Sequence, residues 1–135
     1  MSNLTIEASK TNLDKVIEFV NGELMKLPCT DELKTKLDIA VEEIFVNISS
    51  YAYDEQGEVE IDCNIKEDIF MIEVEFKDSG KPYNPLGRID PDISMGIDER
   101  EIGGLGIFMT KKFLDDIEYR YEDSKNVLII RKKII

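Results

Sequence analysis

Histidine is absent from the 135 residues of this sequence. Histidine is the usual general base near neutral pH and a common metal ligand. Its absence excludes a Ser-His-Asp hydrolase, a His-ligated zinc enzyme and a kinase that phosphorylates a histidine of its own. Any mechanism that uses histidine as base, phosphate carrier or metal ligand is therefore excluded.

Cysteine is scarce as well, with only Cys29 and Cys63 present. Their spacing fits neither a metal-binding clip nor a redox pair. We interpret them as small buried apolar residues, or one of them as a partly exposed thiol, in a reducing compartment.

Basic residues are in deficit, because 17 lysines and arginines face 29 acidic residues and leave a formal charge of −12. Such a field repels nucleic acids and anionic membranes. The negative charge either steers the protein toward a basic partner surface or only keeps it soluble. In either case we expect no direct nucleic-acid or membrane partner.

Long apolar runs are also missing, since no stretch approaches the roughly 18 residues of a membrane span. The first residues contain no basic region followed by an apolar core. We therefore expect a soluble, cytoplasmic protein. The length suits a single domain over residues 1–135, which can bury a core without a metal or disulfide.

Apolar periodicity predicts the order of elements along the chain. Alternation predicts strands over residues 3–8, 58–66, 69–77, 117–122 and 127–131, with residues 123–126 as a turn. Helical spacing predicts helices over 13–27 and 31–52, the second capped by Thr30, and a short third helix after residues 103–106. This order predicts an α+β fold: a two-layer sandwich of a mostly antiparallel five-stranded sheet with three helices on one face.

The first chemical motif is the pair Glu43 and Asn47 on the second predicted helix. Residues four apart share one helix face, here beside the apolar stripe. A carboxylate and an amide so placed suit Mg²⁺ bound through an oxygen, with the carboxylate as a base. The alternative is two solvated side chains on an amphipathic helix.

The second motif begins at Asp78, where a predicted strand gives way to Asp-Ser-Gly-Lys-Pro. Gly80 lets the backbone approach a ligand closely, and the Asp78 carboxylate can accept a hydrogen bond from an exocyclic amine such as that of adenine. The alternative is an ordinary Asp-Ser-Gly turn.

The third motif is a glycine cluster, Gly103-Gly104-Leu105-Gly106, that opens the last predicted helix. Backbone N–H groups at a helix start attract anions, and glycine permits close approach of phosphate. Neither a Walker pattern nor a dinucleotide fingerprint fits these residues. The alternative is a helix start after a loop with unusual backbone angles.

The order of the three motifs resembles the GHKL ATP-binding fold, which gyrase-type, chaperone-type and histidine-kinase ATPase domains share. Within it, the chain is most similar to the small anti-sigma factor/serine-protein kinase group. The stretches 42–47, 78–85 and 103–118 carry this resemblance, which spans nearly the whole chain and leaves no room for a histidine-bearing dimerisation domain.

The resemblance implies roles for individual residues. Asn47 would coordinate Mg²⁺, Glu43 would be the general base, and Asp78 would bind the adenine amine, with Gly80 giving the base room. The triphosphate of ATP would lie along Gly103, Gly104, Leu105 and Gly106, beneath an ATP lid over about residues 79–102.

Some positions depart from the family's pattern. The broader fold often has a second glycine where Pro82 stands. The resulting Asp-x-Gly-x-Pro pattern is more similar to the small-kinase branch. Many relatives place a threonine on the last strands near the adenine amine, and residues 127–130 offer none. The cation for the γ-phosphate is left open among Arg100, Lys81, Lys111 and Lys112.

The family resemblance implies an anti-sigma factor that is also a Mg-ATP-dependent serine/threonine protein kinase. It would phosphorylate an anti-sigma factor antagonist and sequester a sigma factor, usually as a homodimer. Two alternatives stay open: a non-catalytic ATP-binding module that sequesters a partner, and a domain that has lost nucleotide binding. Glu43 favours the kinase, because binding alone requires no base.

Overall fold

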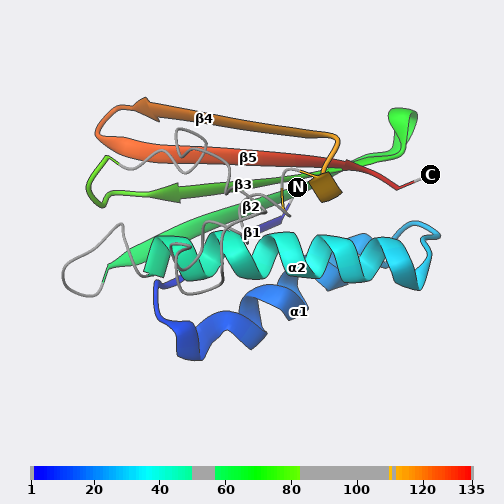
Figure 1. Ribbon diagram of the computed structural model, residues 1–135, viewed down its shortest axis with the longest axis horizontal. Helices are drawn as coiled ribbons and strands as arrows, with labels where there is room; N and C mark the ends of the chain where they lie inside the picture. The colour runs from blue at the N-terminus through cyan, green and yellow to red at the C-terminus, as the bar shows by residue number, and fades with distance from the viewer. Residues whose placement is uncertain (1, 50–56, 83–109, 111, 135) are drawn as a thin grey trace, which may run out of the picture.

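Two layers make up the described part of the chain, which in this computed structural model comprises residues 2–49, 57–82, 110 and 112–134. Helices α1 (Leu13–Leu24) and α2 (Asp31–Asn47) cover one face of a five-stranded sheet (Figure 1). The strands are β1 (Ser2–Glu7), β2 (Glu58–Lys66), β3 (Met71–Asp78), β4 (Asp116–Glu122) and β5 (Lys125–Lys133). The predicted α+β sandwich is therefore confirmed. Residues 110, 112 and 113 are helical where a third helix is expected, and the rest of that helix lies outside the described residues.

The strand order is β1-β2-β3-β5-β4, and each neighbouring pair is antiparallel. Strand β3 therefore lies at the centre of the sheet, between β2 and β5. The register places Asp78, the last residue of β3, opposite Val59 on one side and Asn126 on the other. This central position explains why a polar residue at a strand end is nonetheless buried.

Helix α2 begins where the sequence predicts, since the Thr30 hydroxyl accepts a hydrogen bond from the Leu33 amide at 3.1 Å. Asp31 and Glu32 lie in its first turn, where the helix dipole favours negative charge. The α-helical part ends at Asn47, and residues 48 and 49 form a π-helical turn directly after it. The remainder of the predicted helix, residues 50–52, lies outside the described part of the chain.

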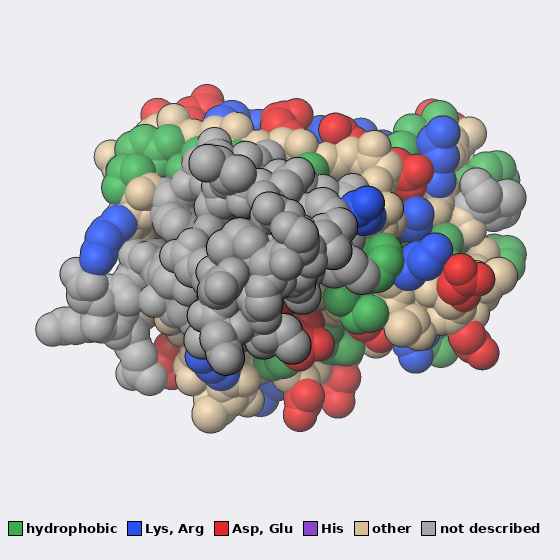
Figure 2. Space-filling view, in the orientation of Figure 1, with side chains coloured by type: hydrophobic (Ala, Val, Ile, Leu, Met, Phe, Trp, Pro, Cys, Tyr) green, Lys and Arg blue, Asp and Glu red, His purple; other side chains and the backbone are tan. Residues whose placement is uncertain are grey.

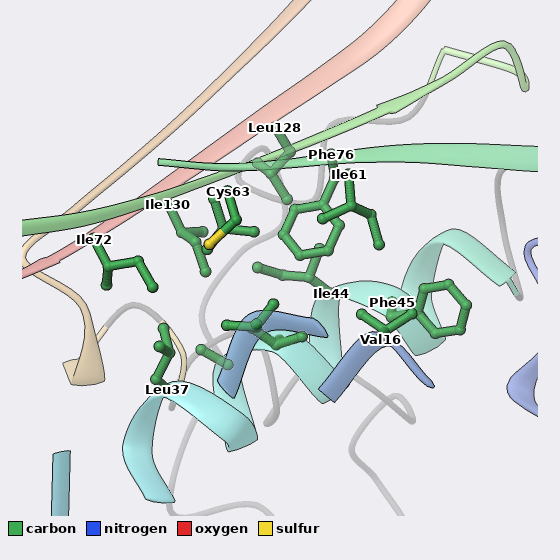
Figure 3. Packing of buried hydrophobic residues seen from close by; sticks show 14 of the residues in the cluster. Val16, Leu37, Ile44, Phe45, Ile61, Cys63, Ile72, Phe76, Leu128 and Ile130 are labelled. Carbon is green, nitrogen blue, oxygen red and sulfur yellow. The ribbon is translucent and has the colours of Figure 1, made fainter. Parts of the chain in front are cut away.

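The core lies between the helices and the sheet. Figure 3 shows Leu37 and Ile44 of α2 directed toward Phe76 and other buried side chains of the sheet. On β3, alternate residues are buried, as the predicted period of two requires. Burial of each large aliphatic or aromatic side chain contributes roughly 1.5–3 kcal/mol, so this layer is the main source of stability.

Both cysteines are free, as the sequence predicts. Cys63 on β2 has no exposed surface and belongs to the core, whereas Cys29 is half-buried. Burial raises the pKa of the Cys63 thiol to about 12. Cys63 is therefore an apolar core residue rather than a nucleophile.

Two hairpin connections differ from the sequence prediction. The β2–β3 link is a 3-10 turn (Glu67–Ile69) followed by Phe70 at φ 50°, so β3 begins at Met71 rather than at residue 69. The Phe70 carbonyl accepts from the Ile134 amide at 2.7 Å, which ties this turn to the C-terminal end of β5. At the β4–β5 turn, Asp123 and Ser124 have positive φ. A tight turn of two such residues leaves Lys125 and Asn126 in the strand, not in the turn as predicted.

The sheet face away from the helices is lined with paired charges. Lys77 lies 3.6–3.8 Å from carboxylates of Glu60, Asp62 and Glu75. Arg120 and Arg131 each contact three acidic side chains as well. Figure 2 shows acidic and basic side chains alternating along the upper edge of the view, where Figure 1 places β4. Among the described residues, no helix has the length and apolar character to cross a membrane.

Candidate functional site

Asn47 lies on the buried face of α2, three residues after Ile44 and four after Glu43. The side chain is 4 % exposed. Its amide nitrogen donates to the Glu43 carbonyl at 2.7 Å and lies 3.4 Å from the Glu43 carboxylate. The sequence placed this residue beside the apolar stripe, whereas the structure places it on the stripe itself.

The Asn47 amide oxygen has no hydrogen-bond partner among the described residues, although it is buried. A buried acceptor left unpaired costs about 1–3 kcal/mol, so it calls for an explanation. The hydrogen bonds from the amide nitrogen to Glu43 fix the amide so that its oxygen faces away from Glu43. An amide oxygen held in this way is a ligand type that Mg²⁺ accepts, so Asn47 fits the predicted metal role.

Glu43 is half-buried one turn before Asn47. Burial raises the pKa of its carboxyl group, the Asn47 hydrogen bond opposes that rise, and neighbouring Glu42 adds to it. A raised pKa brings a carboxylate closer to the operating pH, which makes it a better general base. The structure therefore brings Glu43 and Asn47 together in an arrangement compatible with their predicted roles.

Asp78 is 4 % exposed at the end of β3 and faces the helical layer like Phe76. Its Oδ1 atom accepts from the Gly80 amide at 3.0 Å and from the Asn126 side-chain amide at 2.9 Å. Burial raises the pKa of the Asp78 carboxyl group, and these two hydrogen bonds oppose the rise. Gly80 thus has a contact that the sequence did not predict, a backbone hydrogen bond that orients Asp78.

The two halves of the site lie at the same end of the molecule. Figure 1 shows the C-terminal ends of α2 and β3 together at the left, beside the turn between β4 and β5. Asn47 and Asp78 are the last residues of these two elements, and both are buried in the layer between helices and sheet. The fold therefore brings the first and second motifs to one edge of the sandwich.

Other predicted residues contribute less to the described geometry. Lys81 and Lys112 are exposed. Within the described ranges, no group of three or more Cys, Asp or Glu side chains gathers as a metal site. The other predicted site residues lie outside the described part of the chain: Gly103, Gly104, Leu105, Gly106, Arg100, Lys111 and most of the predicted lid, 83–102.

Asn126 is the residue that sequence analysis missed. Its side chain is 5 % exposed and donates to Asp78 and, at 2.8 Å, to the Lys81 carbonyl. The Asp-Ser-Lys-Asn stretch resembled a four-residue turn, so Asn126 was not considered as part of a strand. All of residues 126–130 are buried, so burial does not alternate along this strand. The available signal was the strand period of two, which places Asn126 on the same side as Leu128 and Ile130.

Known proteins share sequence similarity with this chain. Residues 6–132 match the family described as the histidine kinase-like ATPase domain. The chain is 30 % identical to serine-protein kinase RsbW of Halalkalibacterium halodurans, over 96 % of this chain and 80 % of the relative. It is 31 % identical to RsbW of Listeria monocytogenes over 70 % of this chain, but it spans only 63 % of that relative.

Solved structures show the same fold at low sequence identity. The RsbU and RsbW domains of a Mycobacterium tuberculosis protein align with a TM-score of 0.68 and 11 % identity, covering 99 % of this chain and 33 % of that one. The mycobacterial sensor histidine kinase MprB aligns with a TM-score of 0.58 and 16 % identity, covering 99 % of this chain and all of that one.

Proposed function

Because the chain belongs to the histidine kinase-like ATPase domain family, which implies ATP binding, we propose that it is a Mg-ATP-dependent serine/threonine protein kinase and anti-sigma factor. In this role it phosphorylates an anti-sigma factor antagonist and sequesters a sigma factor. Its similarity at about 30 % identity to serine-protein kinases supports the reaction class. The single observation that carries the proposal is the pair of half-buried Glu43 and buried Asn47, in which the Asn47 amide oxygen has no hydrogen-bond partner among the described residues.

In this proposal, separate residues bind the metal, the adenine base and the phosphates of ATP. Asn47 holds the metal through its amide oxygen, and Asp78 accepts a hydrogen bond from the adenine amine beside Gly80. Bound Mg²⁺ offsets the negative charge of the phosphates during transfer. The glycine cluster supplies backbone N–H groups to those phosphates at Gly103, Gly104, Leu105 and Gly106.

Glu43 is the proposed general base. Its half-buried carboxylate takes the proton of the attacking serine or threonine hydroxyl as the phosphoryl group is transferred. Nucleotide binding alone requires no base, so a carboxylate at position 43, one turn before Asn47, favours the kinase over the non-catalytic ATP-binding module.

Replacement of Glu43 by glutamine tests this role without changing the shape of the side chain. The amide oxygen of glutamine can still accept from Asn47, so Glu43→Gln should bind ATP with Mg²⁺ nearly as tightly as the wild type. Loss of a general base lowers rates by about 10²–10⁴-fold. We expect a decrease of that size in labelling of an antagonist protein by γ-labelled ATP, with calorimetry measuring ATP affinity in parallel.

Glu42 provides the matched control, because it precedes Glu43 on the same helix turn but is exposed. Glu42→Gln should retain nearly full transfer, because Glu42 makes only the smallest contribution to the raised pKa of Glu43. If Glu43→Gln transfers phosphate as fast as the wild type, Glu43 is not the base. If the wild type binds ATP but labels no antagonist, the chain is instead an ATP-binding module that sequesters its partner.

The proposal extends to assembly and location. We place the protein in the cytoplasm as a homodimer that binds its sigma factor directly. Sedimentation of the purified chain, alone and with the sigma factor, tests dimerisation and sigma-factor binding. A chain that stays monomeric, or that does not bind the sigma factor, contradicts this part of the proposal.

A further inference from the structure

A chain of three side chains runs from β4 through β5 to the end of β3. The Tyr119 hydroxyl donates to Oδ1 of Asn126. The Asn126 amide nitrogen in turn donates to Asp78 Oδ1 at 2.9 Å and to the Lys81 carbonyl at 2.8 Å. Neither Tyr119 nor Asn126 has a role in the function proposed above, so their convergence on Asp78 requires an explanation.

The orientation of the Asn126 amide is set by its partners. Its oxygen faces a hydroxyl donor, and its two N–H bonds face two oxygen acceptors, Asp78 Oδ1 and the Lys81 carbonyl. The opposite orientation would place oxygen against both acceptors, which is unfavourable at a site where Asn126 is only 5 % exposed. Tyr119 therefore keeps the donor side of Asn126 turned toward Asp78.

The hydrogen bonds to Asp78 are unequal between its two carboxylate oxygens. Both the Asn126 side chain and the Gly80 backbone donate to Oδ1. A carboxylate whose Oδ1 is held by two donors cannot rotate without breaking both bonds. Among the described residues both donors bind Oδ1, so Oδ2 is the oxygen left to accept a hydrogen bond from a ligand.

We propose that Asn126, held by Tyr119, is a positioning residue that fixes Oδ2 of Asp78 as the acceptor for the amine of a bound nucleobase. The inference rests on the proposed role of Asp78 in binding adenine. It adds that base selectivity depends on side chains of β4 and β5. A purine with a 6-amino group donates to this oxygen, whereas a 6-oxo purine presents an acceptor to it and is disfavoured.

The test combines protein variants with ligand variants. Calorimetry with Mg²⁺ measures the Kd values of ATP, of purine riboside triphosphate, which lacks the 6-amino group, and of inosine triphosphate. A hydrogen bond to a charged acceptor corresponds to about ten- to hundredfold in affinity, so the wild type should prefer ATP to the purine analogue by that factor. In Asn126→Ala we expect this preference to fall below about threefold, because ATP affinity decreases while analogue affinity changes little.

Two further variants make the result specific. Tyr119→Phe keeps the Asn126 amide in place but removes the hydroxyl that orients it, so the preference should be intermediate. Asn3→Ala removes another Asn–Asp hydrogen bond, an exposed one from Asn3 to Asp62 at 2.6 Å, away from the proposed base site. Asn3→Ala should keep the full preference for ATP. If Asn126→Ala does not fold by circular dichroism, Tyr119→Phe decides the test.

Three results would overturn the inference. Full preference for ATP in both Asn126→Ala and Tyr119→Phe would remove the positioning role while leaving the adenine role of Asp78 intact. An equal loss of affinity for ATP and for the purine analogue would assign Asn126 a structural role only. Equal binding of both ligands by the wild type would overturn the adenine role of Asp78 and this inference together.

Discussion

The inner face of the sheet carries few polar side chains, and the outer face carries many. Among the described residues, the buried polar side chains are Asn47, Asp78, Thr110 and Asn126. On the outer face, each of Lys77, Arg120 and Arg131 lies close to three carboxylates at partly exposed positions.

This contrast determines how much stability is lost when a polar side chain loses its partner on each face. Water and neighbouring carboxylates compensate for a lost partner on the outer face, so individual ion pairs there contribute little. On the inner face a lost partner leaves a desolvated polar atom, which costs more. A buried polar side chain on the inner face therefore calls for a specific role, whereas an outer charge does not.

The largest expected difference in the free energy of unfolding is between substitutions at two neighbouring residues of β3. Phe76 is 1 % exposed on the inner face, and Glu75 belongs to the outer ion pairs. Phe76→Ala should lower the free energy of unfolding by about 3–5 kcal/mol through the cavity it leaves. Glu75→Ala should lower it by less than about 1 kcal/mol. Urea denaturation of both variants measures the difference, and comparable losses would contradict the contrast between faces.

Asp78→Asn tests what a buried polar residue of the inner face contributes to ATP affinity and to stability. An uncharged amide is a weaker acceptor than a carboxylate and can place its NH2 group where Oδ2 stood, so ATP affinity should fall about ten- to hundredfold by calorimetry. Removal of a buried carboxylate of raised pKa should leave the free energy of unfolding at pH 7 unchanged or higher.

Asp62→Asn is the matched control on the outer face, because Asp62 also accepts a hydrogen bond from an asparagine side chain. It should leave ATP affinity unchanged. A loss of stability in Asp78→Asn with normal ATP affinity would show that Asp78 is a structural residue.

The smallest effect is expected at Arg131, which hydrogen-bonds Glu73 at 2.8 Å on the outer face. Burial alone would raise the pKa of Glu73, but hydrogen bonds from Arg131 and Lys66 outweigh it and lower that pKa. The resulting stabilisation is present above the pKa of Glu73 in the unfolded chain and is lost as pH falls through its lower value in the folded protein.

Arg131→Met should therefore lower the free energy of unfolding by at most about 1 kcal/mol at pH 7, and less at high salt or low pH. Thermal unfolding between pH 3 and pH 7 at two salt concentrations measures this dependence. A loss that stays constant across pH and salt would mean that packing of the arginine stem, not charge, is what Arg131 contributes.

The contrast also explains what sequence could predict. Alternation of apolar and polar residues is strong where one face meets the core, so β2 is predicted at its observed bounds and β3 to within two residues at its start. Asp78 is identifiable because it follows such a run directly. The burial of Asn47 was less evident, because a polar residue within an apolar stripe conflicts with the pattern used to find the stripe.

The boundaries of turns were harder to predict. The left-handed conformations of Phe70, Asp123 and Ser124 depend on how adjacent strands meet, and neither phenylalanine nor serine is typical there. For that reason β5 begins two residues earlier than predicted, and Asn126 was assigned to a turn instead of to the site. Cross-strand register, which places Asn126 opposite Asp78, arises only when the whole sheet has formed.

The packing of Cys63 gives the molecule a built-in reporter of its own opening. The thiol has no exposed surface and lies among core side chains between sheet and helices. A thiol-specific reagent can reach it only when these layers separate, so its labelling rate follows the opening of the sandwich. Half-buried Cys29 supplies an internal reference within the same chain. Nucleotides or partners that hold the layers together would therefore be detectable as slower labelling of Cys63, without any added probe.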